Sequence, residues 1–335
     1  MRQERDDRDA ARGQILALGE LLVDLIPGRE GMRIEEAGPI IKTASGSAGI
    51  FACAAALLGG CGGFIGKVGN DSLSRMVMRT LKEYGVDLSC VTHSNEGQVG
   101  LAFLEYLPEG RNYQYYRKNS VGSLLRADEL DEDYIGSAYA VHFPGMLLEL
   151  TPQMRGACER MVEIARKKGV MVSFDPNIRQ ELSADACARE RMLWAVRHAD
   201  VVAPTLAEGR MITGEEHMGE VLRALHAMGP RVVALTRDKD GLVLSRDGVA
   251  AIAYGIDEKA VDPTGAGDTL AAALCVGLKE EMPLEALAAF CNCAGTLVIT
   301  KKGAIGMALP TRSEVDAMAA SGVCRVECVP LESLA

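Results

Sequence analysis

From residue 138 onward, short apolar segments alternate with longer amphipathic ones, and this alternation limits the fold more than any other feature of the chain. The short segments are rich in Val, Ile and Leu and have the length of buried strands, whereas the longer ones have the apolar period of helices. We expect strands at 138–145, 170–177, 231–238 and 241–248, a strand followed by a loop at 200–208, and helices at 152–169, 188–199 and 216–229. Strands and helices in this order predict an α/β fold, with a mostly parallel sheet that helices cover on both faces.

The first half of the chain begins with the same alternation. We expect strands at 15–26 and 32–41, a strand and turn at 61–69, and helices at 47–60 and 71–85. Residues 98–119 differ, because polar and apolar residues alternate there around a central PEGRN turn and tyrosines are concentrated in the segment. That pattern predicts a β-hairpin, and its place in the chain predicts a small sheet outside the main body.

Composition limits the partners that the chain can have. Its formal net charge is −10, which makes nucleic acids and anionic membranes poor partners. Residues 1–14 lack the apolar segment of a signal peptide, and no apolar run is long enough to span a bilayer. We therefore expect a cytoplasmic protein whose ten cysteines are reduced core thiols rather than zinc ligands. We divide the chain into a disordered arm at 1–13, one α/β domain at 14–320 and a tail at 321–335.

The most informative short motif is VDPTGAGDTL at 261–270, which opens directly into the apolar helical run AAALCVGL. Gly265 and Gly267 allow a tight turn and a close approach of the backbone to a ligand. The first amides of the helix lack partners within the helix, and its dipole adds partial positive charge, so the turn favours an anion such as a phosphoryl group. Asp268 stands where its carboxylate can accept a proton from a hydroxyl. From these residues alone, the motif fits a kinase acting on an alcohol as well as it fits a capped turn without chemistry. The chain has no GxxxxGK(S/T) P-loop.

Several polar residues follow directly after the expected strands. In open α/β sheets, ligands bind at the carboxyl ends of the strands. The residues at these positions are Asp175, Asn177, Thr205, Glu208, Thr236 and Asp268. Their shared position predicts one ligand site at that edge of the sheet.

These segments, in this order, resemble the ribokinase-like (PfkB) carbohydrate kinases, and among them the fructokinase branch. The resemblance covers residues 14–315, and its most specific part is DPTGAGDT at 262–269. The other matching segments are GELLVDLIP (19–27), FIGKVGNDSLSRMVMRTLKEYGVD (64–87), YYR (115–117), FDPNIR (174–179), ADVVAPTLAEGRMITG (199–214) and KKGAIG (301–306). The resemblance implies a three-layer α/β/α sandwich with a mostly parallel central sheet and a small β lid built from 28–44 and 98–119.

The resemblance also implies roles for individual residues. Asp268 would be the catalytic base, and the amides of Gly265, Ala266 and Gly267 would hold the γ-phosphoryl group. The sugar would contact Asp24, Gly46, Ser47, Arg117, Asn177 and Arg179. ATP would contact Thr205, Thr236, Gly241, Asn292 and Gly303. Glu208 would order water around Mg²⁺, and Asp262 with Thr264 resembles a K⁺-binding loop of some members.

Three positions depart from the family pattern. Ile50 stands where a sugar-binding asparagine is expected, and leaving a sugar hydroxyl unpaired in a closed site costs about 1–3 kcal/mol. Thr205 replaces an asparagine near the metal but still offers an oxygen. Asp238 replaces a glycine of the nucleotide-binding turn, where a carboxylate repels phosphates unless it points away or meets Mg²⁺.

We therefore expect an ATP-dependent sugar kinase, with fructose to fructose 6-phosphate as the leading reaction. The alternative within the family is 2-keto-3-deoxygluconate kinase, because it shares the YYR segment and its deoxygenated substrate suits Ile50. The alternative from another class is a non-catalytic sugar-binding regulator on the same fold. We also expect a homodimer that packs through its lids, because exposed edge strands need cover.

Overall fold

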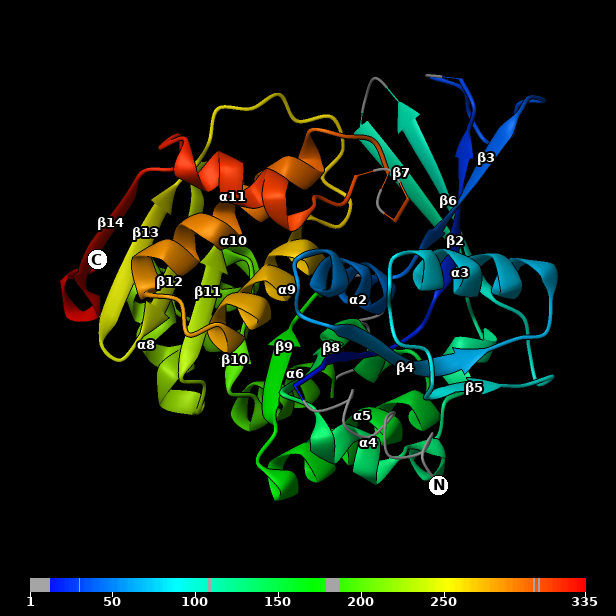
Figure 1. The fold of residues 1–335 in the computed structure, drawn as a ribbon, viewed down its shortest axis with the longest axis horizontal. Helices are drawn as coiled ribbons and strands as arrows, with labels where there is room; N and C mark the ends of the chain where they lie inside the picture. Colours follow the sequence, from blue (N-terminus) through cyan, green and yellow to red (C-terminus); the bar gives the residue numbers. More distant parts are fainter. Residues whose placement is uncertain (1–12, 30, 108–109, 179–186, 304, 307) are drawn as a thin grey trace.

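The computed structural model describes residues 13–335 except 30, 108–109, 179–186, 304 and 307 (Figure 1). Within these residues the main body is a sheet of ten strands, ordered β14-β13-β12-β11-β10-β9-β8-β1-β4-β5. The strands are β1 (Ile15–Leu18), β4 (Gly62–Val68), β5 (Val91–His93), β8 (Ala140–Pro144), β9 (Met171–Asp175), β10 (Val201–Val202), β11 (Val232–Thr236), β12 (Gly241–Arg246), β13 (Val249–Tyr254) and β14 (Val326–Pro330). Neighbours from β11 through to β5 pair in parallel, and β12, β13 and β14 add antiparallel pairs at one edge. The mostly parallel sheet predicted from the sequence is therefore confirmed.

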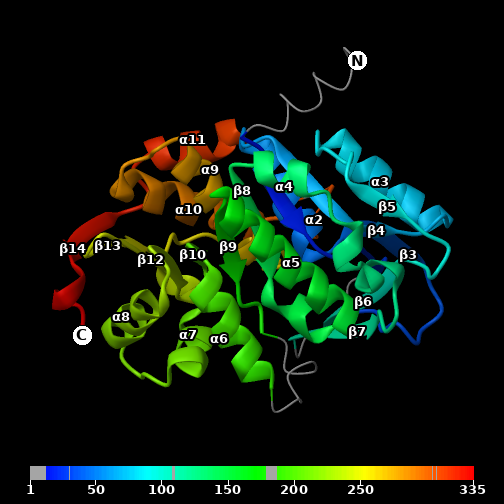
Figure 2. The same cartoon turned by 90° about the horizontal axis from the view of Figure 1, so that it is seen from below.

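Helices cover both faces of this sheet, which makes a three-layer sandwich (Figures 1 and 2). One layer contains α2 (Ser47–Leu57), α3 (Ser72–Glu83), α9 (Ala266–Lys279), α10 (Leu284–Ile299) and α11 (Arg312–Ala320). The other contains α4 (Glu132–Ser137), α5 (Pro152–Lys168), α6 (Ala188–His198), α7 (Leu206–Thr213) and α8 (Met218–Met228). The strands alternate between the two layers: Ile15 and Ala17 of β1 pack into the first core, and Leu16 and Leu18 into the second. This two-sided burial explains why the strands are apolar throughout.

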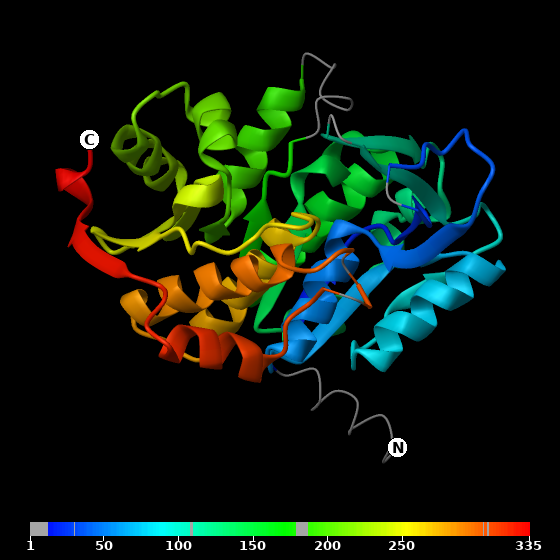
Figure 3. The same cartoon turned by 90° about the horizontal axis from the view of Figure 1, so that it is seen from above.

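A second sheet of four described strands, ordered β3-β2-β6-β7, stands off the main body (Figures 1 and 3). Its strands are β2 (Leu22–Pro27), β3 (Ile40–Ser45), β6 (Gly100–Leu107) and β7 (Gly110–Tyr116). The antiparallel pair of β6 and β7 confirms the hairpin predicted at 98–119. We call this sheet the lid.

Three expectations about these segments need correction. The apolar run at 15–26 is two strands in two sheets, because the chain leaves the central sheet after Leu18 and enters the lid at Leu22. The strand expected at 32–41 begins only at Ile40, so the lid takes Ile40–Ser45 and the unexpected Leu22–Pro27 rather than the whole of 28–44. The expected tail at 321–335 contributes β14, which extends the main sheet beside β13.

The expected arm at 1–13 lies outside the described residues apart from its last residue. Every helix in the part of the chain that the structure describes is too short or too polar to cross a bilayer.

Candidate active site

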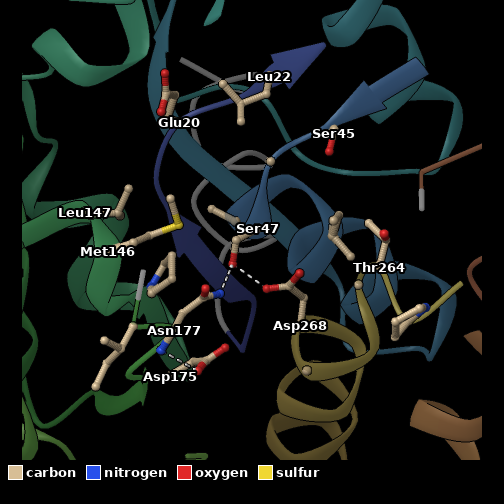
Figure 4. A pocket seen from close by; sticks show the side chains of 18 of the residues that line it. Glu20, Leu22, Ser45, Ser47, Met146, Leu147, Asp175, Asn177, Thr264 and Asp268 are labelled. Atoms are coloured by element: carbon tan, nitrogen blue, oxygen red, sulfur yellow. Dashed lines mark hydrogen bonds between the residues drawn. The ribbon is translucent and has the colours of Figure 1, made fainter. Parts of the chain in front are cut away.

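A cleft of about 310 Å³ opens between the carboxyl ends of the parallel strands and the lid (Figure 4). It contains the point where β9 and β10 end and where α2 and α9 begin. The described residues that line it are Glu20, Leu22, Asp24, Ser45, Gly46, Ser47, Ala48, Ile50, Arg111, Tyr113, Tyr115, Arg117, Pro144, Met146, Leu147, Asp175, Asn177, Ile178, Ala203, Thr205, Glu208, Thr236, Pro263, Thr264, Gly265, Gly267, Asp268 and Leu270. The expected gathering of strand-end residues at one edge of the sheet therefore occurs.

The glycine-rich turn leads directly into α9. Gly265 is the N-cap of that helix and has φ +82°, a left-handed conformation that glycine adopts without strain. Gly267 faces open space, since a Cβ placed on it would approach only Asp175 Oδ2, at 3.9 Å. The Ala266 amide donates to the Pro263 carbonyl at 3.2 Å, and Ala266 does not line the cleft. The two glycines are therefore the better placed of the three expected anion-binding residues.

Asp268 lies in the first turn of α9 and is only 8% exposed. Ser47 donates its hydroxyl to Asp268 Oδ1, and Asn177 Nδ2 donates to Ser47 Oγ at 3.4 Å (Figure 4). Gly46, the N-cap of α2, has φ +109° and leaves no room for a side chain, because a Cβ would come within 2.5 Å of the Glu20 carbonyl oxygen. Two helix N-termini thus meet at Asp268, and their dipoles favour negative charge there.

Asp24 of β2 also lines the cleft and is 5% exposed. Burial raises the pKa of its carboxyl to about 6, and the charge of Asp262 adds to the rise, while a hydrogen bond from Ser45 opposes it. Ile50, which is buried, also lines the cleft, together with Leu22, Met146 and Leu147. The lining of the cleft therefore combines a buried carboxyl group with apolar side chains.

Arg117 reaches the cleft from the end of the hairpin, as expected, but its charge is already compensated. Its Nε donates to Glu20 Oε2 at 3.0 Å, and Ser120 donates its hydroxyl to the other oxygen of Glu20. The guanidinium also lies over the Tyr115 ring, 5.4 Å from its centre. No role was predicted for Glu20, although it lies in the matching GELLVDLIP segment. A buried arginine needs a carboxylate partner, and this requirement could have pointed to Glu20.

Asp262 is completely buried at the base of the glycine-rich turn. Its carboxylate accepts hydrogen bonds from the Thr264 amide at 3.0 Å, the Gly303 amide at 2.9 Å and the Tyr106 hydroxyl. Arg111 Nη1 approaches Asp262 Oδ1 at 3.1 Å and forms an ion pair with it. The K⁺ site expected at Asp262 and Thr264 does not fit this arrangement, because a guanidinium already supplies the positive charge.

Glu208 lies in the first turn of α7, where a strand and loop were expected. Its carboxylate accepts from the Thr205 amide at 2.8 Å and from the Ile178 amide at 2.7 Å, which holds it at the edge of the cleft. Among the described residues no group of three or more His, Cys, Asp or Glu forms a metal site.

The residues expected to bind the nucleotide divide into two groups. Thr205 and Thr236 line the cleft and pair with each other through their backbones. Asp238, Gly241, Asn292 and Gly303 do not line it. Asp238 has φ +50°, so it occupies the left-handed conformation of the glycine it replaces, which Asp tolerates better than most residues.

Asn292 and Gly303 have internal partners. The side-chain amide of Asn292 donates to the Tyr254 carbonyl at 2.8 Å, and the backbone amide of Gly303 donates to the Asp262 carboxylate. Arg179 lies outside the described residues. Asp175, which was expected at the ligand-binding edge of the sheet but without an individual role, lines the cleft beside Gly267 and accepts from the Asn177 amide at 3.0 Å.

Comparison with known proteins points to a single family. Residues 12–312 match the pfkB family of carbohydrate kinases. Fructokinase-1 of Zea mays is 32% identical over 318 residues, which cover 91% of this chain and 97% of that protein. The PfkB protein from Polaromonas sp. JS666 has a similar structure, with a TM-score of 0.82 at 26% identity, covering 91% of this chain and 99% of that chain. The fructokinase from Vibrio cholerae O395, solved in a fructose, ADP and calcium ion bound form, has a TM-score of 0.81 at 24% identity and covers 92% and 99% of the two chains.

Proposed function

The chain belongs to the pfkB family of carbohydrate kinases, and from this premise we propose that it is an ATP-dependent fructokinase. As a carbohydrate kinase it is a phosphotransferase with an alcohol group as acceptor. In the proposed reaction the γ-phosphoryl group of ATP passes to a hydroxyl of fructose and gives fructose 6-phosphate. The similarity to Fructokinase-1 of Zea mays over almost its whole length supports this choice of sugar.

The contact between Ser47 and Asp268 carries the proposal. It places a hydroxyl against a carboxylate at the N-termini of α2 and α9, which is the geometry that an acceptor hydroxyl needs. Asp268 would accept the proton of the attacking sugar hydroxyl. The amides of Gly265 and Gly267, with the dipole of α9, would stabilise the charge that develops on the phosphoryl oxygens. Mg²⁺ bound to the nucleotide would neutralise further phosphate charge, and Glu208 would hold its water ligands.

The charges around the cleft favour a neutral sugar over a sugar acid. Among the described residues that line it, the carboxylates are Glu20, Asp24, Asp175, Glu208 and Asp268, and the cations are Arg111 and Arg117. Both guanidiniums are already paired, Arg117 with Glu20 and Arg111 with Asp262. A substrate carboxylate would therefore meet net negative charge, whereas fructose would offer hydroxyl donors to the acidic groups.

One observation favours 2-keto-3-deoxygluconate as a second candidate. The apolar wall of Ile50, Leu22, Met146 and Leu147 suits a carbon that carries no hydroxyl. The two substrates are separated by steady-state rates of ADP formation with fructose, glucose, ribose and 2-keto-3-deoxygluconate. Fructose should give the highest kcat/KM, and a higher value for 2-keto-3-deoxygluconate would replace the proposed substrate.

The Asp268→Asn variant tests the mechanism and separates a kinase from a sugar-binding regulator. The amide keeps the size of the carboxylate and can still accept from Ser47, so calorimetric sugar binding should persist while kcat falls at least ~10²-fold. Glu285→Gln is the matched control. Glu285 is also a carboxylate in the first turn of a helix, α10, but it has no proposed role as a base. Wild-type protein that binds fructose without forming ADP would point to the regulator.

The homodimer through the lid stays a prediction, as does the cytoplasmic location. Ile40 and Ile41 are 43% and 49% exposed on the edge strand β3, which is consistent with a surface that a second copy covers. Sedimentation equilibrium of the wild type and of Ile41→Lys tests the dimer.

A further inference from the structure

A buried carboxylate, that of Asp262, links the lid to the glycine-rich turn. Asp262 accepts hydrogen bonds from both sides: from Thr264 and Gly303 in the main body, and from Tyr106 of β6 and Arg111 of β7 in the lid. Asp262 is 0% exposed, whereas the Arg111 side chain is 32% exposed. Arg111 therefore reaches from the outer part of the lid to a group in the interior.

A buried carboxylate is costly unless positive charge and hydrogen bonds compensate for it. Burial on its own would raise the pKa of Asp262, but hydrogen bonds from Thr264, Tyr106 and Gly303 hold that pKa below its usual range. The group is therefore ionised at neutral pH, and a cation beside it offsets part of the cost of burying its charge. Among the described residues, the cation that forms an ion pair with it is Arg111.

The same arginine also contacts the residue that precedes Gly265. Arg111 Nη1 lies 3.2 Å from Thr264 Oγ1, and the Tyr113 hydroxyl lies 3.1 Å from the same oxygen. Thr264 Oγ1 in turn donates to Asp262 Oδ1 at 2.6 Å. A shift of Arg111 would therefore be transmitted to the backbone that carries the Gly265 and Gly267 amides.

We propose that Arg111 is a positioning residue for phosphoryl transfer. Its guanidinium neutralises Asp262 and ties the lid to the glycine-rich turn, so that the turn needs no monovalent cation there. The inference rests on the kinase function proposed above. It replaces the K⁺ site expected from the sequence with a residue of the chain itself.

The test uses Arg111→Ala, Arg111→Lys and the control Arg160→Ala in KCl and in tetramethylammonium chloride of equal ionic strength. Arg160 is matched to Arg111, because its side chain is also 32% exposed and is ion-paired, but its partners are the exposed Glu132 and Glu163 on the outer surface. Wild-type and Arg160→Ala kinase rates should be the same in the two salts. Arg111→Ala should lose about 10- to 100-fold in kcat with little change in nucleotide affinity, as expected for a misplaced reacting group. K⁺ should restore part of that loss. The kcat of Arg111→Lys should lie between those of the wild type and Arg111→Ala.

A second readout does not depend on turnover. Arg111→Ala should unfold at a higher temperature in K⁺ than in tetramethylammonium, because K⁺ can bind to the Asp262 carboxylate once the guanidinium is removed. The wild type should unfold at the same temperature in both salts. Hydrogen exchange of the 262–268 segment should be faster in Arg111→Ala. Wild-type stimulation by K⁺, or an unchanged kcat in Arg111→Ala, would overturn the inference. If no sugar is phosphorylated by the wild type, the proposed function fails, while unfolding and exchange still decide the role of Arg111.

Discussion

Gly267→Ala should separate stability from catalysis. Gly267 is the second residue of α9 and does not have the positive φ that would exclude a side chain. A Cβ there would meet only Asp175 Oδ2, at 3.9 Å, which is an ordinary van der Waals distance. The fold therefore has room for the methyl group, and the methyl group would project into the cleft where the phosphoryl group is proposed to bind.

The expected magnitudes have opposite signs. Replacing glycine by alanine inside a helix stabilises a protein by roughly 0.5–1 kcal/mol, and the first turn should give the lower end of that range. Removing one donor of an anion hole costs about 10²–10³-fold in kcat, and a methyl group over the Gly267 amide should have a similar effect. The variant should be slightly more stable than the wild type and nearly inactive.

Urea unfolding and steady-state ADP formation measure the two effects on the same preparation. Gly156→Ala is the control, because Gly156 lies within α5, no residue of which lines the cleft, and a Cβ there would meet nothing within 4 Å. It should gain at least as much stability as Gly267→Ala and keep full activity. A Gly267→Ala enzyme with wild-type kcat would refute the placement of the phosphoryl group. A variant that unfolds at a lower urea concentration than the wild type would show that the fold has no room for a methyl group at this position.

Two further predictions concern Asp24 and Glu20, the buried carboxyl groups that line the cleft. The pKa of Asp24 is raised from its ordinary 3.8 to about 6, which corresponds to roughly 3 kcal/mol of unfavourable ionisation in the folded state. Because the folded pKa is the higher one, wild-type stability relative to Asp24→Asn should fall as pH rises from about 4 to 6 and then level off; parallel stability curves in urea would contradict this. Glu20→Gln leaves the Arg117 guanidinium, whose side chain is only 9% exposed, without its carboxylate, and should cost about 3–5 kcal/mol in urea unfolding. The double variant Glu20→Gln/Arg117→Met should recover most of that loss, and additive losses would show that the pair is not coupled.

Local patterns were sufficient to predict much of the fold and the centre of the site. The alternation of strands and helices predicted the sandwich, and the hairpin followed from alternation around a turn. The turn at 262–268 and the helix after it were also recognisable, because turn geometry and a helix start depend on residues a few positions apart. The split of 15–26 between two sheets was not predictable in this way, since both halves are apolar enough to be buried strands.

The sequence by itself determined that a carboxylate, two glycines and a helix N-terminus occur together at 265–268, because all of them lie within one turn of chain. Only the tertiary structure decided what surrounds them. Ser47 and Asp268 are 221 residues apart, Arg111 and Asp262 are 151 apart, and Glu20 and Arg117 are 97 apart. These contacts depend on the order of strands in two sheets and on where the lid lies over the cleft. Residue patterns report which face of a strand or helix is buried, but they carry no record of which distant side chain lies against it.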